Sequence, residues 1–323
     1  MRLPLHLQSS RYFTFGTLQE FIKASGTSTD AEIAEYERLE ALGLPPISSR
    51  HSLALMLGVN PALIWSFEAR PHRFYRTFHI AKGRSTRRID APRVGLKIVQ
   101  KWLSAQLQAA YSPPEHVYGF VPNRSHVQAA SIHCGAEWIL SADIADFFPS
   151  TPFALVEANL KRLGFNEYAA RTIASLSCLD GALAQGAPTS PVLSNICFDE
   201  MDKALLALAT KHQARLSRYA DDIVFSGSGE VSETLISEIR DLFVQSPWEL
   251  SERKFVLSRR PNRLKVHGLL VEDKRPKLTK GYRNKLRAFR HLLANGRVRS
   301  AKDVEIMAGH LAYSDFVEKS FET

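Results

Sequence analysis

Two adjacent aspartates carry the strongest chemical signal in the chain. Asp221 and Asp222 follow an aromatic and a small residue, Tyr219 and Ala220, and precede the apolar run 223–225. The pattern predicts a β-hairpin whose tip holds two carboxylates. Two like charges at one tip are costly unless a cation lies between them, and hard carboxylate oxygens suit Mg²⁺, which also binds substrate phosphates. A solvated aspartate pair on a turn is the alternative for this motif taken alone.

A third aspartate makes a metal site the better interpretation. Asp143 ends the apolar, strand-like run 138–142. One carboxylate at a strand end and two on a facing hairpin form the ligand set of a two-metal phosphoryl-transfer site. In such a site one ion lowers the pKa of a primer hydroxyl and the other steadies the triphosphate. By itself Asp143 suits a helix N-cap equally well. We expect Asp143, Asp221 and Asp222 to be catalytic and, with Ile144, to bind two Mg²⁺ ions.

A loop between these acidic sites is the third motif. Residues 185–191 read Gln-Gly-Ala-Pro-Thr-Ser-Pro, and an apolar run follows. The glycine and the two prolines predict a loop, with Pro191 near the first turn of a helix. Such a loop lets backbone approach a flat base and a template strand, although an ordinary turn before a helix has the same composition.

The ordered series of motifs resembles a reverse transcriptase. Motifs A, B, C and D and the primer grip of that family are matched in order by Asp143 with Phe148, by 185–191, by 219–222, by Lys254 and by Val266-His267-Gly268. Segments 82–92, 93–103 and 119–125 resemble the family's fingers region, so the likeness covers roughly Arg70 to the C-terminus. The resemblance implies an RNA-directed DNA polymerase that uses dNTP substrates.

Further site residues follow from this resemblance. It implies a primer grip at Val266, His267 and Gly268, and nucleotide contacts from Lys82, Arg87, Phe148, Gln185, Gly186 and Lys254. Adjacent residues of a strand face opposite ways, so only one of Arg87 and Arg88 should face the nucleotide. Arg87 is favoured because it fits the family's Arg-x-Ile spacing before Pro92. Phe148 is expected to exclude a 2′-hydroxyl, which argues against an RNA-dependent RNA polymerase; a buried core Phe is the alternative.

Within the family, residues 143–150 and 185–191 are most similar to bacterial retron enzymes. Ala129 and His267 depart from that pattern, which usually has Asn and Thr there. The retron resemblance implies a structured noncoding RNA template, a cDNA product, a separate effector protein and a role in antiphage defence. A non-retron defence reverse transcriptase, or an idle ribonucleoprotein scaffold that restrains a partner effector, is the alternative. The clustered aspartates favour an enzyme, because a scaffold has no need of such costly charges.

The composition limits the class of protein that these hypotheses can describe. The chain has 323 residues, 45% hydrophobic content and a net charge of +9, which suits a globular protein that binds a polyanion. Its three cysteines include no CxxC pair, so reduced thiols are expected. Because no apolar run approaches the ~20 residues of a membrane span, a cytoplasmic protein without a membrane partner is expected.

The patterning predicts an α+β fold, and the resemblance implies a right-hand polymerase with fingers, palm and thumb. A helical N-terminal extension is expected at 1–70, fingers and palm with an antiparallel sheet at 71–270, and a basic helical thumb at 271–323. A hairpin is expected within 74–91, and palm strands near 138–143, 216–219 and 223–226. Helices are expected near 49–57, 93–110, 125–135, 152–161, 166–177, 191–209 and 231–245, besides an acidic helix that ends at Leu42.

The C-terminal part is the most basic. Between Lys274 and Arg299 there are ten Lys or Arg residues and no Asp or Glu. Residues 278–293 predict a helix with Tyr282, Leu286, Phe289 and Leu293 on one side. Cations around the rest suit contacts with a nucleic-acid backbone, and a solubilising surface helix is the alternative. The expected nucleic-acid contacts are Arg93, Lys97, Arg124, Lys280, Arg283 and Arg287.

Overall fold

The structure is a computed structural model that describes residues 4, 10–26, 29–83, 85–296 and 300–320. The chain divides into two compact units that alternate along the sequence. The first comprises Met1–Pro113, Ala145–Glu200 and Ser246–Glu249; the second comprises Pro114–Ile144, Met201–Gln245 and Leu250–Thr323. The boundaries expected at residues 70 and 270 stay predictions.

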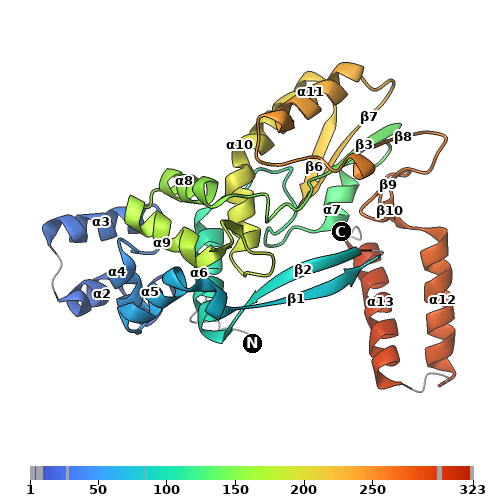
Figure 1. Ribbon diagram of the computed structural model, residues 1–323. Helices are drawn as coiled ribbons and strands as arrows, with labels where there is room; N and C mark the ends of the chain where they lie inside the picture. Colours follow the sequence, from blue (N-terminus) through green and yellow to red (C-terminus); the bar gives the residue numbers. More distant parts are fainter. Residues whose placement is uncertain (1–3, 5–9, 27–28, 84, 297–299, 321–323) are drawn as a thin grey trace. The chain divides into compact units, whose positions relative to one another are not determined.

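A four-stranded antiparallel sheet organises the second unit (Figure 1). Its strand order is β6-β7-β3-β8, formed by Arg215–Tyr219, Asp222–Gly227, Trp138–Asp143 and Val256–Arg259. Because side chains alternate along a strand, Ile139 and Val224 lie on one face of the sheet, where they join the core cluster of this unit. Helix α7 (His126–Ser131) contributes Val127 and Ala130 to the same cluster.

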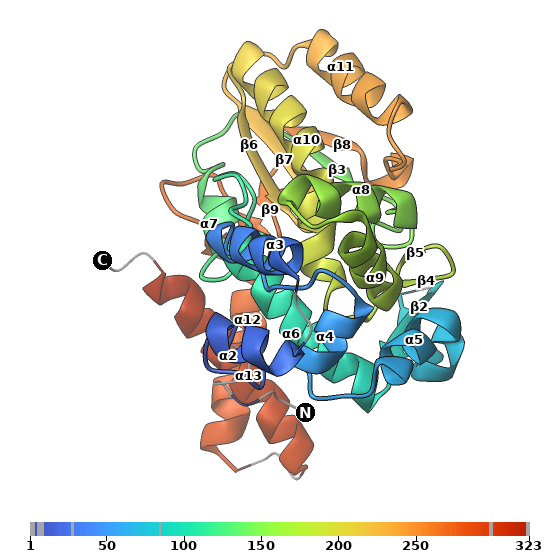
Figure 2. The same ribbon diagram turned by 90° about the vertical axis from the view of Figure 1, so that its left-hand side faces the viewer.

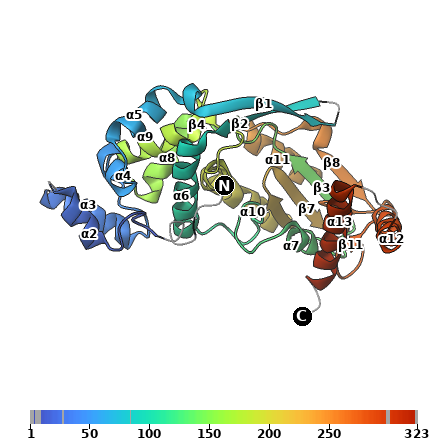
Figure 3. The same ribbon diagram turned by 90° about the horizontal axis from the view of Figure 1, so that it is seen from below.

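That core extends into the C-terminal segment. A three-stranded sheet of β9 (Lys265–Val266), β10 (Leu269–Leu270) and β11 (Lys277–Leu278) adds Val266, Leu269 and Leu278 to the cluster. Helices α12 (Lys280–Ala294) and α13 (Ala301–Lys319) lie side by side in Figures 1 and 3 and reach the cluster through Leu286 and Val317. Most of each helix surface is therefore left to solvent, which suits a binding role better than a core role.

The first unit is mainly helical (Figure 2). A long ribbon of β1 (Tyr75–Lys82) and β2 (Ser85–Pro92) and a short hairpin of β4 (Cys178–Leu179) and β5 (Ala182–Leu183) complete it. Its helices are α2 (Leu18–Ser25), α3 (Asp30–Ala41), α4 (Arg50–Met56), α5 (Pro61–Ala69), η1 (Pro71–Phe74), α6 (Val94–Ala110), α8 (Phe153–Leu163), α9 (Glu167–Ser177) and the start of α10 (Ser190–Lys211), which ends in the second unit.

The expected palm strands and helices are confirmed, with small shifts at their ends. Helix α7 is shorter than expected, since the chain turns before Gly135, which has a φ of 73°. Side-chain caps at Thr29 and Ser49 start α3 and α4, and Asn60 followed by Pro61 starts α5. The second unit also contains α11 (Glu233–Val244), expected near 231–245, and the short helix η2 (Glu252–Lys254).

The sequence patterns did not predict several elements, among them α2, β8 and α13. Helix α2 lies in a stretch without clear periodicity, and β8 is a short edge strand that leaves Val256 exposed. Helix α13 spreads its apolar residues around its axis, so Ile306 and Phe316 are exposed while Val317 is buried. Among the described residues, no helix has the length and apolar character needed to cross a membrane.

Candidate active site

The register of the sheet brings the acidic residues together. Asp143 is the last residue of β3 and pairs directly with Asp222, the first residue of β7. Asp221 precedes Asp222 in the loop after β6, and the Ile144 N–H donates to the Asp221 carbonyl at 3.0 Å. The three carboxyl groups that the sequence patterns singled out therefore occur at one end of a single sheet, within one unit.

The turn between β6 and β7 is tight and strained. Tyr219 pairs with Asp222, so Ala220 and Asp221 alone connect the strands. Ala220 has a φ of 59°, a left-handed conformation that a two-residue hairpin favours at this position for glycine. A non-glycine residue there costs about 1–3 kcal/mol and persists only where its surroundings hold it. The turn must therefore be supported by contacts from outside the hairpin.

Two basic side chains contact the aspartates. The Lys254 ammonium is ion-paired with Asp143, and His267 Nδ1 lies 3.7 Å from Asp222 Oδ2. Burial raises the pKa of Asp143, and the nearby charges of Asp221 and Asp222 raise it further against the opposing effect of Lys254. Burial also acts to raise the pKa of Asp222, but contact with His267 outweighs it and lowers that pKa. Clustered, partly neutralised carboxylates of this kind are the environment a cation stabilises.

The chemistry of these donors fits a divalent metal ion. Carboxylate oxygens are hard ligands, and their mutual repulsion is relieved by positive charge between them. As the side chains lie, no three His, Cys, Asp or Glu groups in the described ranges surround a point that would hold an ion. Lys254 places a positive charge on Asp143 instead, and the His267 ring lies beside Asp222.

The segment expected to grip a primer forms a second tight turn. Residues His267 and Gly268 connect β9 to β10, and both have positive φ, 49° and 83°, as a type I′ hairpin requires. Val266 is buried in the core of this unit, while the His267 ring lies 5.3 Å from the Tyr219 ring of the aspartate turn. The turn therefore stands directly beside the acidic hairpin.

The other expected nucleotide contacts belong to the first unit. The Asp90 N–H donates to the Gln185 carbonyl at 2.8 Å, and a Cβ on Gly186 would lie 2.9 Å from the Asp90 carbonyl oxygen. The absence of a side chain at Gly186 thus lets the loop approach β2 closely. Phe148 is half-buried, with its ring 5.9 Å from that of Phe147.

The strand register separates Arg87 from Arg88. Arg87 lies opposite Ile80, whereas Arg88 lies opposite His79 on the other face of the ribbon. The Arg88 guanidinium is held by Asp90 at 3.0 Å and Asp180 at 2.8 Å. Because the Arg88 side chain is already paired with two protein carboxylates, Arg87 is the better candidate to bind a nucleotide phosphate. The side chain of Lys82, at the end of β1, lies outside the described part of the structure.

The expected nucleic-acid contacts differ in their surroundings. Lys280, Arg283 and Arg287 are exposed on α12, where with Arg290 they line a surface cavity of about 390 Å³. Arg93 is exposed at the start of α6, and Lys97 is half-buried one turn later. Arg124, in contrast, donates to the carbonyls of Pro114 and Val117 at 2.5 and 2.6 Å, so its guanidinium orders a loop of its own unit.

Two groups of residues near the turn were missed by the sequence patterns. His126 stacks on Tyr313 and stands edge-on to Tyr219. Arg218 and Asp202 are fully buried and form an ion pair behind the turn. The position of Arg218, immediately before Tyr219 of the aspartate motif, was the available signal for it.

Comparisons of the sequence with known proteins give one family. A profile of the family described as reverse transcriptase (RNA-dependent DNA polymerase) matches residues 80–271. The retron Mx65 reverse transcriptase of Myxococcus xanthus is 31% identical over 306 residues, which cover 87% of this chain and 69% of that protein. The retron Ec86 reverse transcriptase of Escherichia coli is 27% identical over 291 residues, covering 88% and 89%.

A solved structure is similar at a lower level. Telomerase from Candida albicans, in complex with a fragment of telomeric RNA, has a TM-score of 0.44 and 10% identity, over 67% of this chain and 50% of that chain.

The family profile spans more than half of the chain, and the Mx65 enzyme is similar along most of it. The fold is a right-hand polymerase with an antiparallel sheet, and the family joins dNTPs with the help of divalent metal ions. The chain therefore belongs to the reverse transcriptases, the RNA-directed DNA polymerases, and within them to the retron-like bacterial type.

Proposed function

We propose that this protein copies a dedicated, structured noncoding RNA into DNA by two-metal nucleotidyl transfer with Mg²⁺, as the polymerase of an antiphage defence system with a separate effector protein. The observation that supports the chemistry is the pairing of Asp143 with Asp222 at one end of the sheet, with Asp221 beside them. The similarity to retron enzymes supports the choice of template and product.

Asp143, Asp221 and Asp222 are the residues that would hold the ions, and Ile144 offers its backbone carbonyl as a further oxygen ligand. When bound, the two ions lower the pKa of the primer hydroxyl and stabilise charge on the triphosphate and the leaving pyrophosphate. Lys254, now ion-paired with Asp143, would neutralise the triphosphate. Val266, His267 and Gly268 would support the primer strand beside the acidic turn.

The first unit would supply the nucleotide contacts. Lys82 and Arg87 bind the triphosphate in this proposal, and Gln185 and Gly186 line the nucleotide site. Phe148 lies under the sugar and excludes a 2′-hydroxyl, so Phe148→Ala should admit ribonucleotides. The division into an N-terminal extension at 1–70, fingers and palm at 71–270 and a thumb at 271–323 belongs to the same proposal.

RNA binding would rest on the cations. Lys280, Arg283 and Arg287 contact the nucleic-acid backbone in this proposal, together with Arg93, Lys97 and Arg124. Phosphate contacts supply affinity with little sequence information, so recognition of one RNA requires shape as well as charge.

The nucleic acid that copurifies with the protein tests the proposal. The protein and an Asp222→Asn control, expressed in the native host, are purified, and the bound nucleic acid is sequenced with and without RNase treatment. We expect a single structured RNA in both preparations and a covalently attached DNA copy of it in the wild type alone. Unbranched DNA of unrelated sequence would contradict the dedicated template, and RNA without DNA in the wild type would contradict synthesis.

The defence role is tested separately. Host cells that carry the complete native locus should resist phages that plate efficiently on cells without it. The Asp222→Asn locus should lose this resistance, because the effector is restrained or released through the RNA–DNA product. Equal plating of a broad phage panel on all three strains would contradict a role in defence.

A further inference from the structure

We infer that Arg218 is a positioning residue of the polymerase reaction: its buried guanidinium, clamped by Asp202, holds the carbonyl of Ala220 and thereby fixes the turn that presents Asp221 and Asp222. The inference rests on the proposed catalytic role of these two aspartates. It is argued from three buried residues, Arg218, Asp202 and His116, and none of them belongs to the motifs that define the site.

All three nitrogens of the Arg218 guanidinium donate hydrogen bonds. Arg218 Nε and Nη2 donate to the two carboxylate oxygens of Asp202 at 2.7 and 2.5 Å, and Nη1 donates to the Ala220 carbonyl at 3.0 Å. Asp202 lies on α10, so the fork connects a helix to the tip of the β6–β7 hairpin. The planar guanidinium suits this geometry, because it offers donors in fixed directions to two acceptors at once.

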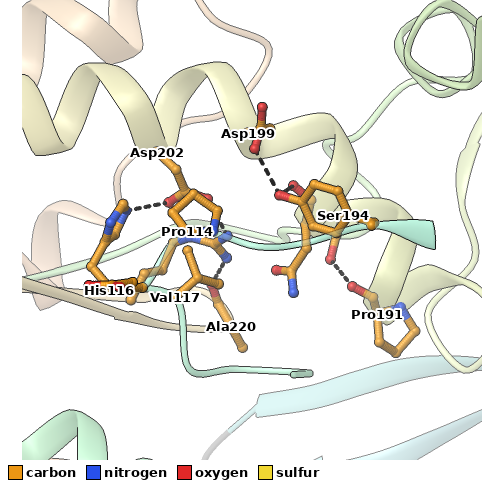
Figure 4. Close-up of polar contacts among 12 residues, drawn as sticks. Pro114, His116, Val117, Pro191, Ser194, Asp199, Asp202 and Ala220 are labelled. Carbon is orange, nitrogen blue, oxygen red and sulfur yellow. Dashed lines mark hydrogen bonds and ion pairs between the residues drawn. The ribbon is translucent and has the colours of Figure 1, made fainter. Parts of the chain in front are cut away.

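A third residue closes the network from the side. His116 Nε2 lies 3.5 Å from Asp202 Oδ1, and Figure 4 shows His116, Asp202 and Ala220 gathered at this point. Burial acts to raise the pKa of Asp202, but the charge of Arg218 and the contact with His116 outweigh it, so that pKa is lowered. Asp202 is therefore held as a carboxylate although it is completely buried.

The segment around His116, residues 114–124, also supports the turn through its backbone. The Arg218 N–H donates to the His116 carbonyl and the Arg218 carbonyl accepts from the Tyr118 N–H, each at 2.8 Å. Val117 forms a parallel bridge with Arg218, and Arg124 orders this segment through the carbonyls of Pro114 and Val117. Residues 114–124 are thus held to β6 by backbone hydrogen bonds and to one another by the Arg124 side chain.

Glycine at position 119 completes the support. A Cβ on Gly119 would lie 2.0 Å from the Ala220 nitrogen, so only glycine lets the segment reach the turn. Ala220 is the residue with the left-handed φ of 59°, and it is held on one side by this contact and on the other by the Arg218 guanidinium. Release of the carbonyl would let the peptide rotate and move both aspartates, which follow it directly.

Stability alone does not explain the buried pair. Replacing a buried ion pair by apolar residues of similar volume is often neutral or stabilising. A fold that needed only a filled space behind the turn would therefore be served by Leu or Met. The directional bond to Ala220 is what an apolar replacement removes, and it acts on the aspartates rather than on the core.

The first test compares Arg218→Lys with Arg215→Lys. Arg215 lies on the same strand, is partly buried, and donates to the carbonyls of Ile132 and Cys134 instead of the turn. Lysine keeps the charge at both positions but loses the planar fork. We expect Arg218→Lys to lower kcat by about 10- to 100-fold and to raise the Mg²⁺ concentration for half-maximal rate, with the KM for dNTP little changed. Arg215→Lys should keep the wild-type kcat and Mg²⁺ requirement.

A variant that keeps the fold shows whether a loss of activity comes from the missing hydrogen bond or from unfolding. The double variant Arg218→Met/Asp202→Leu removes the charges together and should fold, as thermal unfolding will report, yet share the kinetic defect of Arg218→Lys. Wild-type kcat and Mg²⁺ dependence in either folded Arg218 variant would overturn the inference.

An Asp222→Asn control separates this inference from the proposed site. If Asp222→Asn polymerises DNA normally, the site assignment fails and the inference fails with it. If Asp222→Asn is inactive while both Arg218 variants are normal, the inference alone fails.

Discussion

The acidic turn and the basic face of α12 are both strongly charged, and they are built in opposite ways. Behind the turn, Arg218 and Asp202 are completely buried, and the Ala220 backbone is held from two sides. On α12 only Leu286 is buried, and the cations Lys280, Arg283 and Arg287 stand in solvent. Chemistry needs reacting groups held to a fraction of an ångström, whereas a phosphate backbone is bound by charges on flexible stems.

The comparison predicts two kinds of failure. A small change at the turn should remove turnover and leave RNA affinity intact, because the groups there position charge for one reaction. A change on the exposed face of α12 should weaken affinity gradually and leave the chemistry intact at saturating RNA. The four tests below run from the largest expected effect to the smallest.

The largest effect is expected at the turn. Asp222→Asn removes one negative charge opposite Asp143 and should lower dNTP incorporation by orders of magnitude, since the acidic cluster would no longer hold Mg²⁺. RNA affinity, measured by filter binding, should stay within about twofold, because it rests on Lys and Arg. Primer extension with quantified product is the assay; turnover at the wild-type rate would show that the acidic cluster is not the active site.

The next effect concerns the buried side of α12. Leu286 is 2% exposed within the core cluster, so Leu286→Asp buries an unpaired charge and should destabilise the unit by about 3 kcal/mol or more. The matched control is Ala288→Asp, which places the same charge at an exposed position of the same helix. Chemical denaturation measures both. Equal stability of the two variants would mean that α12 does not depend on this contact.

A smaller effect is expected for Arg87 and Arg88, two adjacent residues of β2 that also differ in how firmly they are held. Arg88 is fixed between Asp90 and Asp180, whereas Arg87 faces the other side of the ribbon. Arg87→Ala should raise the KM for dNTP about tenfold or more, in line with the loss of one charged hydrogen bond to phosphate. Arg88→Ala should change that KM little. Steady-state kinetics on both variants decide, and the reverse order would place the nucleotide on the opposite face.

The smallest effect per residue is expected on the exposed face of α12. Changing Lys280, Arg283 and Arg287 together to Gln should weaken RNA binding and flatten its salt dependence by about one unit per lost phosphate contact. Single-nucleotide addition at saturating RNA should survive. Filter-binding titrations at several salt concentrations measure the slope. An unchanged affinity and slope would make this face a solvated surface and move the RNA contacts to Arg93, Lys97 or Arg124.

Local patterns were sufficient for much of the fold. An apolar run that ends in Asp143 predicted β3, an apolar run that follows Asp222 predicted β7, and α4 lies where a helix was expected near 49–57. They failed for α13, whose apolar residues are spread around the helix, and for the edge strand β8. A local pattern reports burial on one face, so it is weak wherever an element is exposed on most sides.

The sequence by itself determined which residue types could act: three carboxylates, a lysine, a loop with one glycine and two prolines, and a basic helix, in the order of a reverse transcriptase. Side-chain type and order are properties of the chain, and they need no partner to be recognised. The alternation of strand residues also determined that Arg87 and Arg88 face opposite ways.

Only the tertiary structure decided which of these groups meet. The register of β3 against β7 places Asp143 opposite Asp222, and a shift by one residue would turn the carboxylate to the other face. The clamp of Asp202 on Arg218 joins α10 to β6, and the Arg124 guanidinium turns inward onto the Val117 carbonyl. Such contacts depend on how separate elements pack, and packing is set by the whole core rather than by any local pattern.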